Sequence, residues 1–215
     1  MPGTNVIRAI LFAAALLYGA SAFAQDRFEI YGDYTYLNFA PTITGVQNQS
    51  FNGGGGGVAL NFAKILQIKA DFQGYANTTV TKVVTSPEFL PGGGLVPPGT
   101  YTASGDLFTY LFGPVLRIPI WKIKPFGEVL FGGSSTDIYT NLQKSIIAGG
   151  GTVIRTQTQH PFTLAAGGGV DISITHRISI RPVEFDYVLT RYSNPLTSTN
   201  NQNNYRYLGG MVFKF

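Results

Sequence analysis

Cysteine is missing altogether from the 215-residue sequence. Its absence excludes disulfide bonds, thiolate metal sites, a cysteine nucleophile and lipoprotein-type lipidation. Charge is scarce as well: charged residues make up 12% of the chain, against about 25% in an average globular protein. The basic residues are scattered, without a cluster of five or six, which argues against nucleic-acid binding because that requires a basic stripe.

Long apolar runs are also absent beyond the first 24 residues, so no later stretch predicts a membrane-spanning helix. The N-terminal segment has one positive charge, Arg8, an apolar run from Ala9 to about Leu17, and the small-x-small pattern Ala22-Phe23-Ala24. This combination is typical of a secretory signal peptide. We therefore expect residues 1–24 to be a cleaved signal peptide and residues 25–215 to form one domain.

Glycine and aromatic residues are plentiful, with 27 Gly, 12 Tyr and 16 Phe. Together with the low charge, this composition indicates a β-protein that faces something less polar than water. Period-two alternation of apolar and polar residues, bounded by turn-forming residues, predicts strands. It predicts eight, each near the ~9–11 residues that a tilted membrane strand needs. They are 27–39, 55–63, 66–80, 105–118, 123–139, 161–174, 178–192 and 204–215.

The connections between these segments alternate in length. Three are only a few residues long, whereas the others are longer polar segments such as "TKVVTSPEFLPGGGLVPPGT" and "SNPLTSTNNQNN". Short turns at one rim and long loops at the other are typical of outer-membrane barrels, in which the short turns are periplasmic. The predicted fold is therefore all-β: an eight-stranded antiparallel up-and-down transmembrane barrel. Its long loops, rich in Gly, Pro, Ser, Thr and Asn, are expected to be mobile and solvated.

Charged residues concentrate on one face of the predicted strands; in 66–80, Lys69 and Asp71 alternate with Ile68 and Ala70. An eight-stranded barrel has an interior just wide enough to be filled by side chains, and a buried charge there must be paired. We predict a salt-bridged, largely occluded interior instead of a water channel. The interior polar network is assigned to Glu29, Asp33, Lys69, Asp71, Arg117, Glu128, Asp171, Arg181, Glu184, Asp186, Arg206 and Lys214.

The segment 178–192 breaks the parity, because Arg181 is at an odd position whereas Glu184 and Asp186 are at even ones. Proline cannot donate a ladder hydrogen bond. We therefore predict a β-bulge near Pro182, which would return all three charges to the interior.

The final stretch, "YRYLGGMVFKF", alternates between an aromatic face and a face with two basic residues. Phe213 and Phe215 are expected to face lipid at the rim, where aromatic girdles lie. This strand is expected to close the barrel against 27–39.

Several stretches resemble a known family: "EIYGDYTYLNF", "LFGPVLRI", "KPFGEVLFGGS", "AAGGGVDISITHRISIRPVEFDYVLTRY" and the closing "YRYLGGMVFKF". They are similar to the small outer-membrane barrel superfamily that includes the OmpA transmembrane domain and the OmpX-like and opacity-type proteins. The resemblance implies a bacterial outer-membrane location, contact with membrane lipid and lipopolysaccharide, and recognition of Phe213 and Phe215 by the barrel-assembly machinery. The sequence continues no further than Phe215, so the peptidoglycan-binding domain of many OmpA-type members is not expected.

Residues for catalysis or metal binding are few. Of the two histidines, His160 precedes the predicted strand 161–174 and His176 lies in a short turn, and neither has Asp, Glu or Cys at ligand spacing. His160 with a serine such as Ser134, Ser135 or Ser145 would be the minimal set for a lipid-modifying enzyme. The runs of glycine are not followed by Lys-Ser or Lys-Thr, which a phosphate-binding loop requires.

We therefore expect no catalytic residue, cofactor or metal, and a non-enzymatic barrel with a structural or adhesin-like role through an unknown extracellular partner. Three alternatives stay open at this point. They are a lipid A deacylase or acyltransferase, a small-solute pore, and a soluble lipocalin-like barrel in which the charged face would be outside.

Overall fold

The structure is a computed structural model that describes residues 27–43, 45–91, 93–153, 160–192, 196 and 201–215. The expected signal peptide lies outside these ranges. Eight strands close into one antiparallel barrel, in the order β1-β11-β10-β9-β7-β6-β3-β2. Their bounds are β1 (Phe28–Phe39), β2 (Gln49–Asn61), β3 (Leu66–Val84), β6 (Gly99–Arg117), β7 (Ile123–Thr136), β9 (Phe162–Ser173), β10 (Ile178–Arg191) and β11 (Asn201–Lys214).

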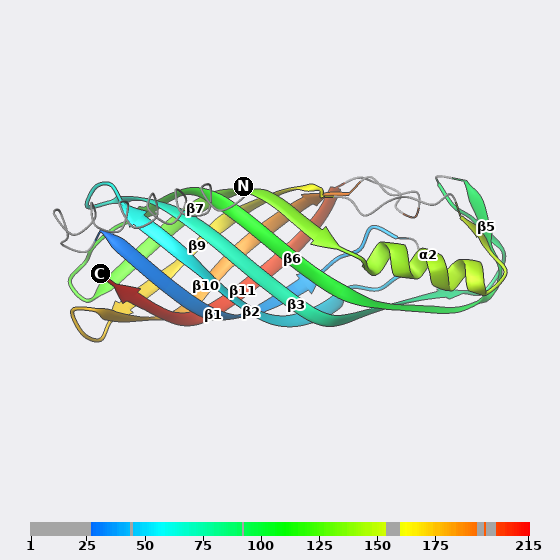
Figure 1. Ribbon diagram of the computed structural model, residues 1–215, viewed down its shortest axis with the longest axis horizontal. Helices are drawn as coiled ribbons and strands as arrows, with labels where there is room; N and C mark the ends of the chain where they lie inside the picture. Colours follow the sequence, from blue (N-terminus) through cyan, green and yellow to red (C-terminus); the bar gives the residue numbers. More distant parts are fainter. Residues whose placement is uncertain (1–26, 44, 92, 154–159, 193–195, 197–200) are drawn as a thin grey trace, which may run out of the picture.

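Each of these strands pairs with its neighbours in the chain, and β11 closes the barrel against β1 (Figure 1). The closing pair runs from Glu29 opposite Lys214 to Asn38 opposite Tyr205. The backbone N–H of Phe215 donates to the carbonyl of Phe28 at 2.8 Å. The predicted up-and-down barrel and its closure by the last strand are thus confirmed.

Apolar side chains cover the outside of the barrel. Exposure alternates strongly between neighbouring residues of a strand: Phe112 is 47% exposed, whereas Leu111 is fully buried. Proteins that face water rarely expose large contiguous apolar areas, so this outer surface is the one that faces lipid. It includes Ile30, Tyr34, Ile68, Phe72, Phe108, Phe112, Val129, Phe131, Phe162, Ile172, Ile180, Phe185, Tyr207, Met211 and Phe213.

Short turns join strands at the end of the barrel where β1 begins and β11 ends, at 62–65, 118–122 and 174–177. The opposite end is much larger, because β3 and β6 continue past the barrel as a paired hairpin from Thr78 and Gly105 to Val84 and Gly99. The helix α2 (Ile138–Ala148) packs against β6 there. Within the described ranges, no helix is long and apolar enough to cross a membrane.

A second, small sheet completes this end, with the order β4 (Glu88–Phe89), β5 (Gly94–Val96) and β8 (Thr152–Val153). Figure 1 shows the helix and this sheet beyond the barrel, at the end opposite to the C-terminus. We call residues 78–105 and 137–153 the head.

The head corrects the expectation of mobile loops. The loop-like stretch after 66–80 continues β3 to Val84 and then forms β4 and β5. The strand expected over 123–139 ends at Thr136, and α2 follows. Its apolar residues recur at helical spacing, with Ile138, Leu142 and Ile146 buried on one face. Turn-forming residues on both sides of this segment, such as Ser134, Ser135 and Gly149, favour a loop and obscure the helical period.

Other strand bounds also differ from the prediction at the long-loop end. β2 begins at Gln49 instead of 55, β6 at Gly99 instead of 105, and β11 at Asn201 instead of 204. Of the stretch expected to be a mobile loop before the last strand, 193–195 and 197–200 lie outside the described residues. Leu196 is buried in the apolar core, and Asn201–Asn204 already pair with β10.

Candidate functional site

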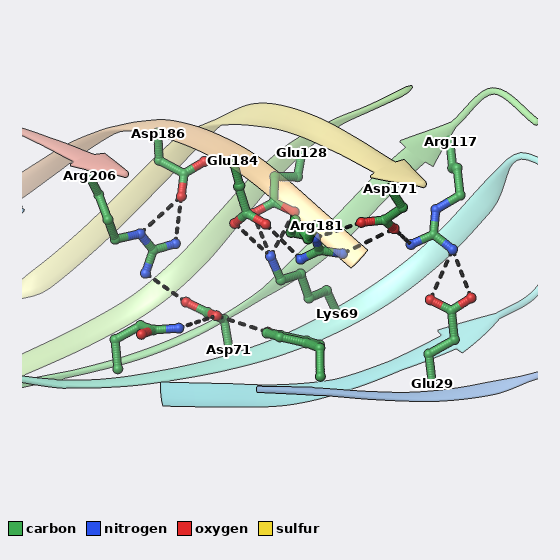
Figure 2. A network of polar contacts seen from close by, with 12 residues as sticks. Glu29, Lys69, Asp71, Arg117, Glu128, Asp171, Arg181, Glu184, Asp186 and Arg206 are labelled. Atoms are coloured by element: carbon green, nitrogen blue, oxygen red, sulfur yellow. Dashed lines mark hydrogen bonds and ion pairs between the residues drawn. The ribbon is translucent and has the colours of Figure 1, made fainter. Parts of the chain in front are cut away.

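Charged side chains fill the part of the bore that begins at the short turns, where Glu29, Arg117 and Asp171 lie near strand ends. Figure 2 shows how these side chains contact one another. The structure joins ten of the twelve residues assigned to the interior into ion pairs, all of them nearly inaccessible to solvent. The ten come from seven different strands, so the network ties opposite walls of the barrel together. They are Glu29, Lys69, Asp71, Arg117, Glu128, Asp171, Arg181, Glu184, Asp186 and Arg206.

One chain of ion pairs begins near the short-turn mouth. Arg117 Nη1 lies 2.7 Å from Glu29 Oε1, and its Nη2 lies 2.8 Å from Asp171 Oδ2. Arg181 then bridges Asp171 and Glu184, with Nε 2.7 Å from Asp171 Oδ1 and Nη1 2.6 Å from Glu184 Oε2. Acidic and basic side chains thus alternate along the bore. Their mutual attraction offsets part of the free-energy cost of removing each charge from water.

Lys69 occupies the centre of the network. Its Nζ donates to Glu128 at 3.0 Å and to Glu184 at 2.9 Å, and it lies 4.9 Å from the centroid of the Tyr31 ring. The Arg181 guanidinium lies 4.5 Å from the centroid of the Phe126 ring. Aromatic faces therefore accommodate the sides of these cations that carboxylates do not reach.

Arg206 forms a separate group deeper in the bore. Its Nη2 and Nη1 lie 2.6 Å from Asp186 Oδ2 and 2.7 Å from Asp71 Oδ2. The Tyr31 hydroxyl donates to Asp71 Oδ1 at 2.8 Å, so the same tyrosine touches both groups. A side chain at Gly57 would displace Tyr31, because a Cβ there would lie 2.8 Å from the Tyr31 Cζ atom and would collide with the Ala70 carbonyl.

The β-bulge expected near Pro182 is present, because the register of β10 with β11 shifts between Arg181 and Glu184. Both of these residues are buried inside the barrel, as is Asp186, while Pro182 and Val183 between them are exposed on the outside. Without the extra residue, either the arginine or the two acids would face lipid.

Asp33 and Lys214 stand apart from the ion pairs. Both Asp33 carboxylate oxygens are shielded from solvent and accept no hydrogen bond within the described part of the chain. Lys214 Nζ donates to Ser179 Oγ at 2.7 Å and, weakly, to Ser173 Oγ at 3.5 Å. The structure therefore places these two residues inside the barrel but assigns them no ionic partner.

The prediction overlooked one ion pair, in the head. Lys82 is fully buried and its Nζ lies 2.8 Å from Glu88 Oε2. Alternation alone places Lys82 outside, because Lys69 and Asp71 are at odd positions and Lys82 is at an even one. A shift in the register of β3 with β6 between Tyr75 and Thr78 reverses the parity and brings Lys82 inside. The Pro and Gly residues that follow this stretch favour a loop on sequence alone.

An apolar core fills the half of the bore nearest the head and continues into the head itself. Between this core and the charged network lies a cavity of only about 10 Å³, lined by residues that include Tyr75, Leu107 and Arg206; about one water fits such a space. Side chains of the described residues thus fill the bore in two layers. The core contains Leu37, Phe39, Ile43, Phe51, Tyr75, Val80, Val84, Leu90, Val96, Tyr101, Ala103, Leu107, Ile138, Tyr139, Leu142, Ile146, Tyr192 and Leu196.

The serine and the histidine that could form a catalytic pair are not hydrogen-bonded to each other in the described structure. Ser134 is buried and its hydroxyl is hydrogen-bonded to Tyr192 at 3.1 Å and to Thr163 at 3.2 Å. Burial raises the pKa of Tyr192 to about 12, so this tyrosine stays protonated and is no base at neutral pH. His160 is exposed, and in the described ranges no hydrogen bond joins it to a serine.

Three carboxylates, those of Glu128, Glu184 and Asp186, have oxygens within 4.8 Å of one another, a spacing compatible with a metal ion. In the structure these acids are bound by protein cations: Lys69 holds both glutamates, and Arg206 holds Asp186. A metal ion would have to compete with these cations for the same oxygens.

Comparison with known proteins supports the fold. No protein-family model and no curated protein sequence matches the chain. Among solved structures, Neisserial surface protein A aligns over 87% of this chain and 97% of its own, with a TM-score of 0.58 and 10% identity. The outer-membrane protein OprG of Pseudomonas aeruginosa aligns over 88% and 96%, with a TM-score of 0.58 and 13% identity.

The chain therefore has the fold of the small outer-membrane β-barrels that its sequence resembles. With its charged residues inside and its apolar side chains outside, it is an integral eight-stranded barrel of the bacterial outer membrane. The soluble alternative is wrong, since that fold would place the charged faces of the strands on the outside.

Proposed function

We propose that the protein is a non-enzymatic membrane anchor with an occluded bore, which presents a rigid head at the cell surface for contact with an extracellular partner. The observation that carries the proposal is the two-layer filling of the bore. Ion-paired side chains occupy one half, and an apolar core that continues into the head occupies the other. A structure filled in this way serves as a stable support and leaves no path for a solute.

The head supports the outward-facing part of the proposal. Long connections of outer-membrane barrels face the exterior, and here the described residues of two of them form the head, a unit with its own buried residues. An exposed surface that is already rigid binds with a smaller loss of conformational entropy than a mobile loop does. Phe89 on β4 is 82% exposed, and exposed aromatic side chains are common in interfaces.

The hydrogen bonds of Ser134 support the absence of an acyl-transfer activity. A serine nucleophile needs a base within hydrogen-bond reach of its hydroxyl, and the Ser134 hydroxyl contacts Tyr192 and Thr163 instead. Incubation of the refolded protein with lipopolysaccharide, followed by mass spectrometry of lipid A, tests this part. We expect the acyl chains to be unchanged; loss or gain of one chain would contradict the proposal.

Conductance across planar lipid bilayers tests the occluded bore. We expect the full-length protein to give no stable single-channel steps, because the bore lacks a continuous water-filled path. Discrete ohmic steps that scale with the amount of inserted protein would favour the small-solute pore instead. A well-characterised porin added to the same bilayers controls for the detection limit.

The role of the head is tested by replacing residues 86–97, which include β4 and β5, with a two-residue Asn-Gly turn. The exchange shortens the connection between β3 and β6 but keeps the paired residues of both strands, up to Val84 and Gly99. We expect Gram-negative cells that express the variant to keep normal outer-membrane levels but to attach less well to epithelial monolayers than cells with the wild-type protein. Equal attachment at equal surface levels would contradict a surface-contact role for the head.

A further inference from the structure

The short-turn end of the barrel is strongly basic. Each of the three short turns carries one lysine or arginine, Lys64, Lys122 and Arg177, and none of the turn segments 62–65, 118–122 and 174–177 contains Asp or Glu. Arg27 precedes β1 at the same end, and Lys124 and Lys214 lie at the adjacent strand ends. The scarcity of charge elsewhere in the chain makes this concentration unusual.

Several of these basic residues surround an open cavity of about 290 Å³ in the short-turn mouth, close to the lower limit of ligand pockets. Five cationic side chains and one carboxylate line it. The carboxylate is that of Glu29, and both of its oxygens are already bound by Arg117 at 2.7 and 2.9 Å. The lining consists of Arg27, Glu29, Asn61, Phe62, Ala63, Lys64, Arg117, Pro119, Lys124 and Lys214.

Hydrogen-bond donors in this mouth are not fully used. The Nε–H of Arg117 is shielded from solvent and has no acceptor in the described structure, although the arginine itself is 6% exposed. The ammonium group of Lys214 donates only to serine hydroxyls, and no carboxylate of the described residues lies within ion-pair distance of it. Lys124, a second ammonium group, lines the same cavity, so the two like charges repel each other until an anion lies between them.

We propose that this mouth is a binding site for a phosphate-bearing anion that enters from the short-turn side. Lysines bind phosphate as point charges, and charge-assisted bonds of this kind are the strongest that side chains form. The convergence of several cations favours an anion with more than one negative charge. Either a free phosphate compound or the headgroup of a membrane phospholipid supplies this chemistry.

Titration of the full-length protein in zwitterionic detergent micelles with inorganic pyrophosphate, followed calorimetrically, is the direct test. We expect saturable binding that the double variant Lys124→Gln/Lys214→Gln weakens about tenfold or more, as loss of charge-assisted bonds implies. The matched control is Lys122→Gln/Arg177→Gln, which removes two charges at the same rim but outside the cavity. We expect its affinity to stay within about twofold of the wild-type value.

Equal losses in the two variants would overturn the proposal, because the attraction would then come from the basic rim as a whole. Absence of saturable binding by the wild-type protein would overturn it as well. The heat-dependent gel mobility of each variant verifies that the barrel is closed. If Lys214→Gln prevents folding, Lys64→Gln/Lys124→Gln replaces it, because both of these side chains are accessible to solvent.

A second arm distinguishes the two sources of phosphate. Micelles doped with phosphatidylglycerol are compared with micelles doped with phosphatidylcholine, and displacement of pyrophosphate is measured. Displacement by the anionic lipid at mole fractions found in membranes assigns the site to a lipid headgroup. Pyrophosphate binding that the lipid leaves unchanged assigns it to a soluble phosphate compound.

Discussion

The short-turn half of the bore and the head are built with opposite chemistry, although β3 and β6 run through both. In the bore near the short turns, ten inward side chains are charged and ion-paired, and apolar ones such as Phe126 and Val212 lie among them. In the head, the inward side chains are apolar, and the described ion pair is that of Lys82 with Glu88. The difference follows from the surroundings, since lipid covers the outside of the barrel whereas water covers the head.

The two regions also gain stability in different ways. A head surrounded by water is held together by burial of apolar area, as a soluble domain is. In the barrel, the apolar side chains on the outside face lipid whatever fills the bore. Inside it, a buried ion pair gives little net stabilisation relative to an apolar pair of the same size. Removal of one partner is nevertheless costly in the bore, because the remaining charge stays buried.

The largest effect is therefore expected in the bore, from Arg206→Met. Asp71 and Asp186 would lose the cation that they share, at a cost of about 3–5 kcal/mol in the free energy of unfolding. Urea unfolding in lipid vesicles, followed by the fluorescence of the single tryptophan, Trp121, measures it. Lys144→Met, on the exposed face of α2, is the control. If Arg206→Met lowers the free energy of unfolding by less than about 1 kcal/mol, the expected difference between the bore and the head is wrong.

In the head, Leu142→Ala removes a fully buried side chain from α2, at a cost of about 2–5 kcal/mol. We expect this loss to be local: hydrogen exchange should speed up in α2 and the β3–β6 hairpin, while the amides of the barrel stay protected. Lys144→Ala, on the exposed side of the same helix, should leave exchange unchanged. Faster exchange throughout the barrel would show that bore and head unfold as one unit.

Lys82→Met sharpens the comparison, because it removes a buried cation from the head. Its partner differs from those of Arg206: the Glu88 side chain is 25% exposed, and it can turn to water once the lysine is gone. The expected loss is about 1 kcal/mol or less, measured by the same hydrogen-exchange experiment. A loss as large as that of Arg206→Met would mean that partner exposure does not set the cost.

Phe215→Ser changes a side chain that lies in neither the bore nor the head, and it should have the smallest effect on the free energy of unfolding. The Phe215 ring faces outward and lies 6.3 Å from that of Phe28. If this residue is part of the assembly signal, the outer-membrane level falls several-fold while unfolding of the refolded protein changes little. Tyr205→Ser, at the far end of the same face of β11, is the control, and equal membrane levels for both variants would argue against the signal.

Most lipid-facing and inward-facing positions of the barrel could be predicted from the sequence, and in β3 the predicted parity holds as far as Tyr75, after which a register shift reverses it. Alternation is a local property, because successive side chains of a strand point to opposite faces whatever the strand pairs with. The bulge at Pro182 followed from the same rule, since Arg181 and Glu184 could share the interior only if one residue was inserted between them. The even number of strands and the alternation of short and long connections then determined the barrel and its two unequal ends.

Which charge pairs with which was decided only by the tertiary structure. Asp71 and Arg206 are 135 residues apart, and Lys69 and Glu184 are 115 apart, so their contacts depend on the register of every strand between them. The head likewise depended on packing: Leu142 becomes core only because β3 and β6 extend far enough to cover it, and isolated helices as short as α2 are marginal in water. The basic mouth arises because barrel closure brings three separate turns, the start of β1 and the end of β11 into one ring, a proximity that no local pattern encodes.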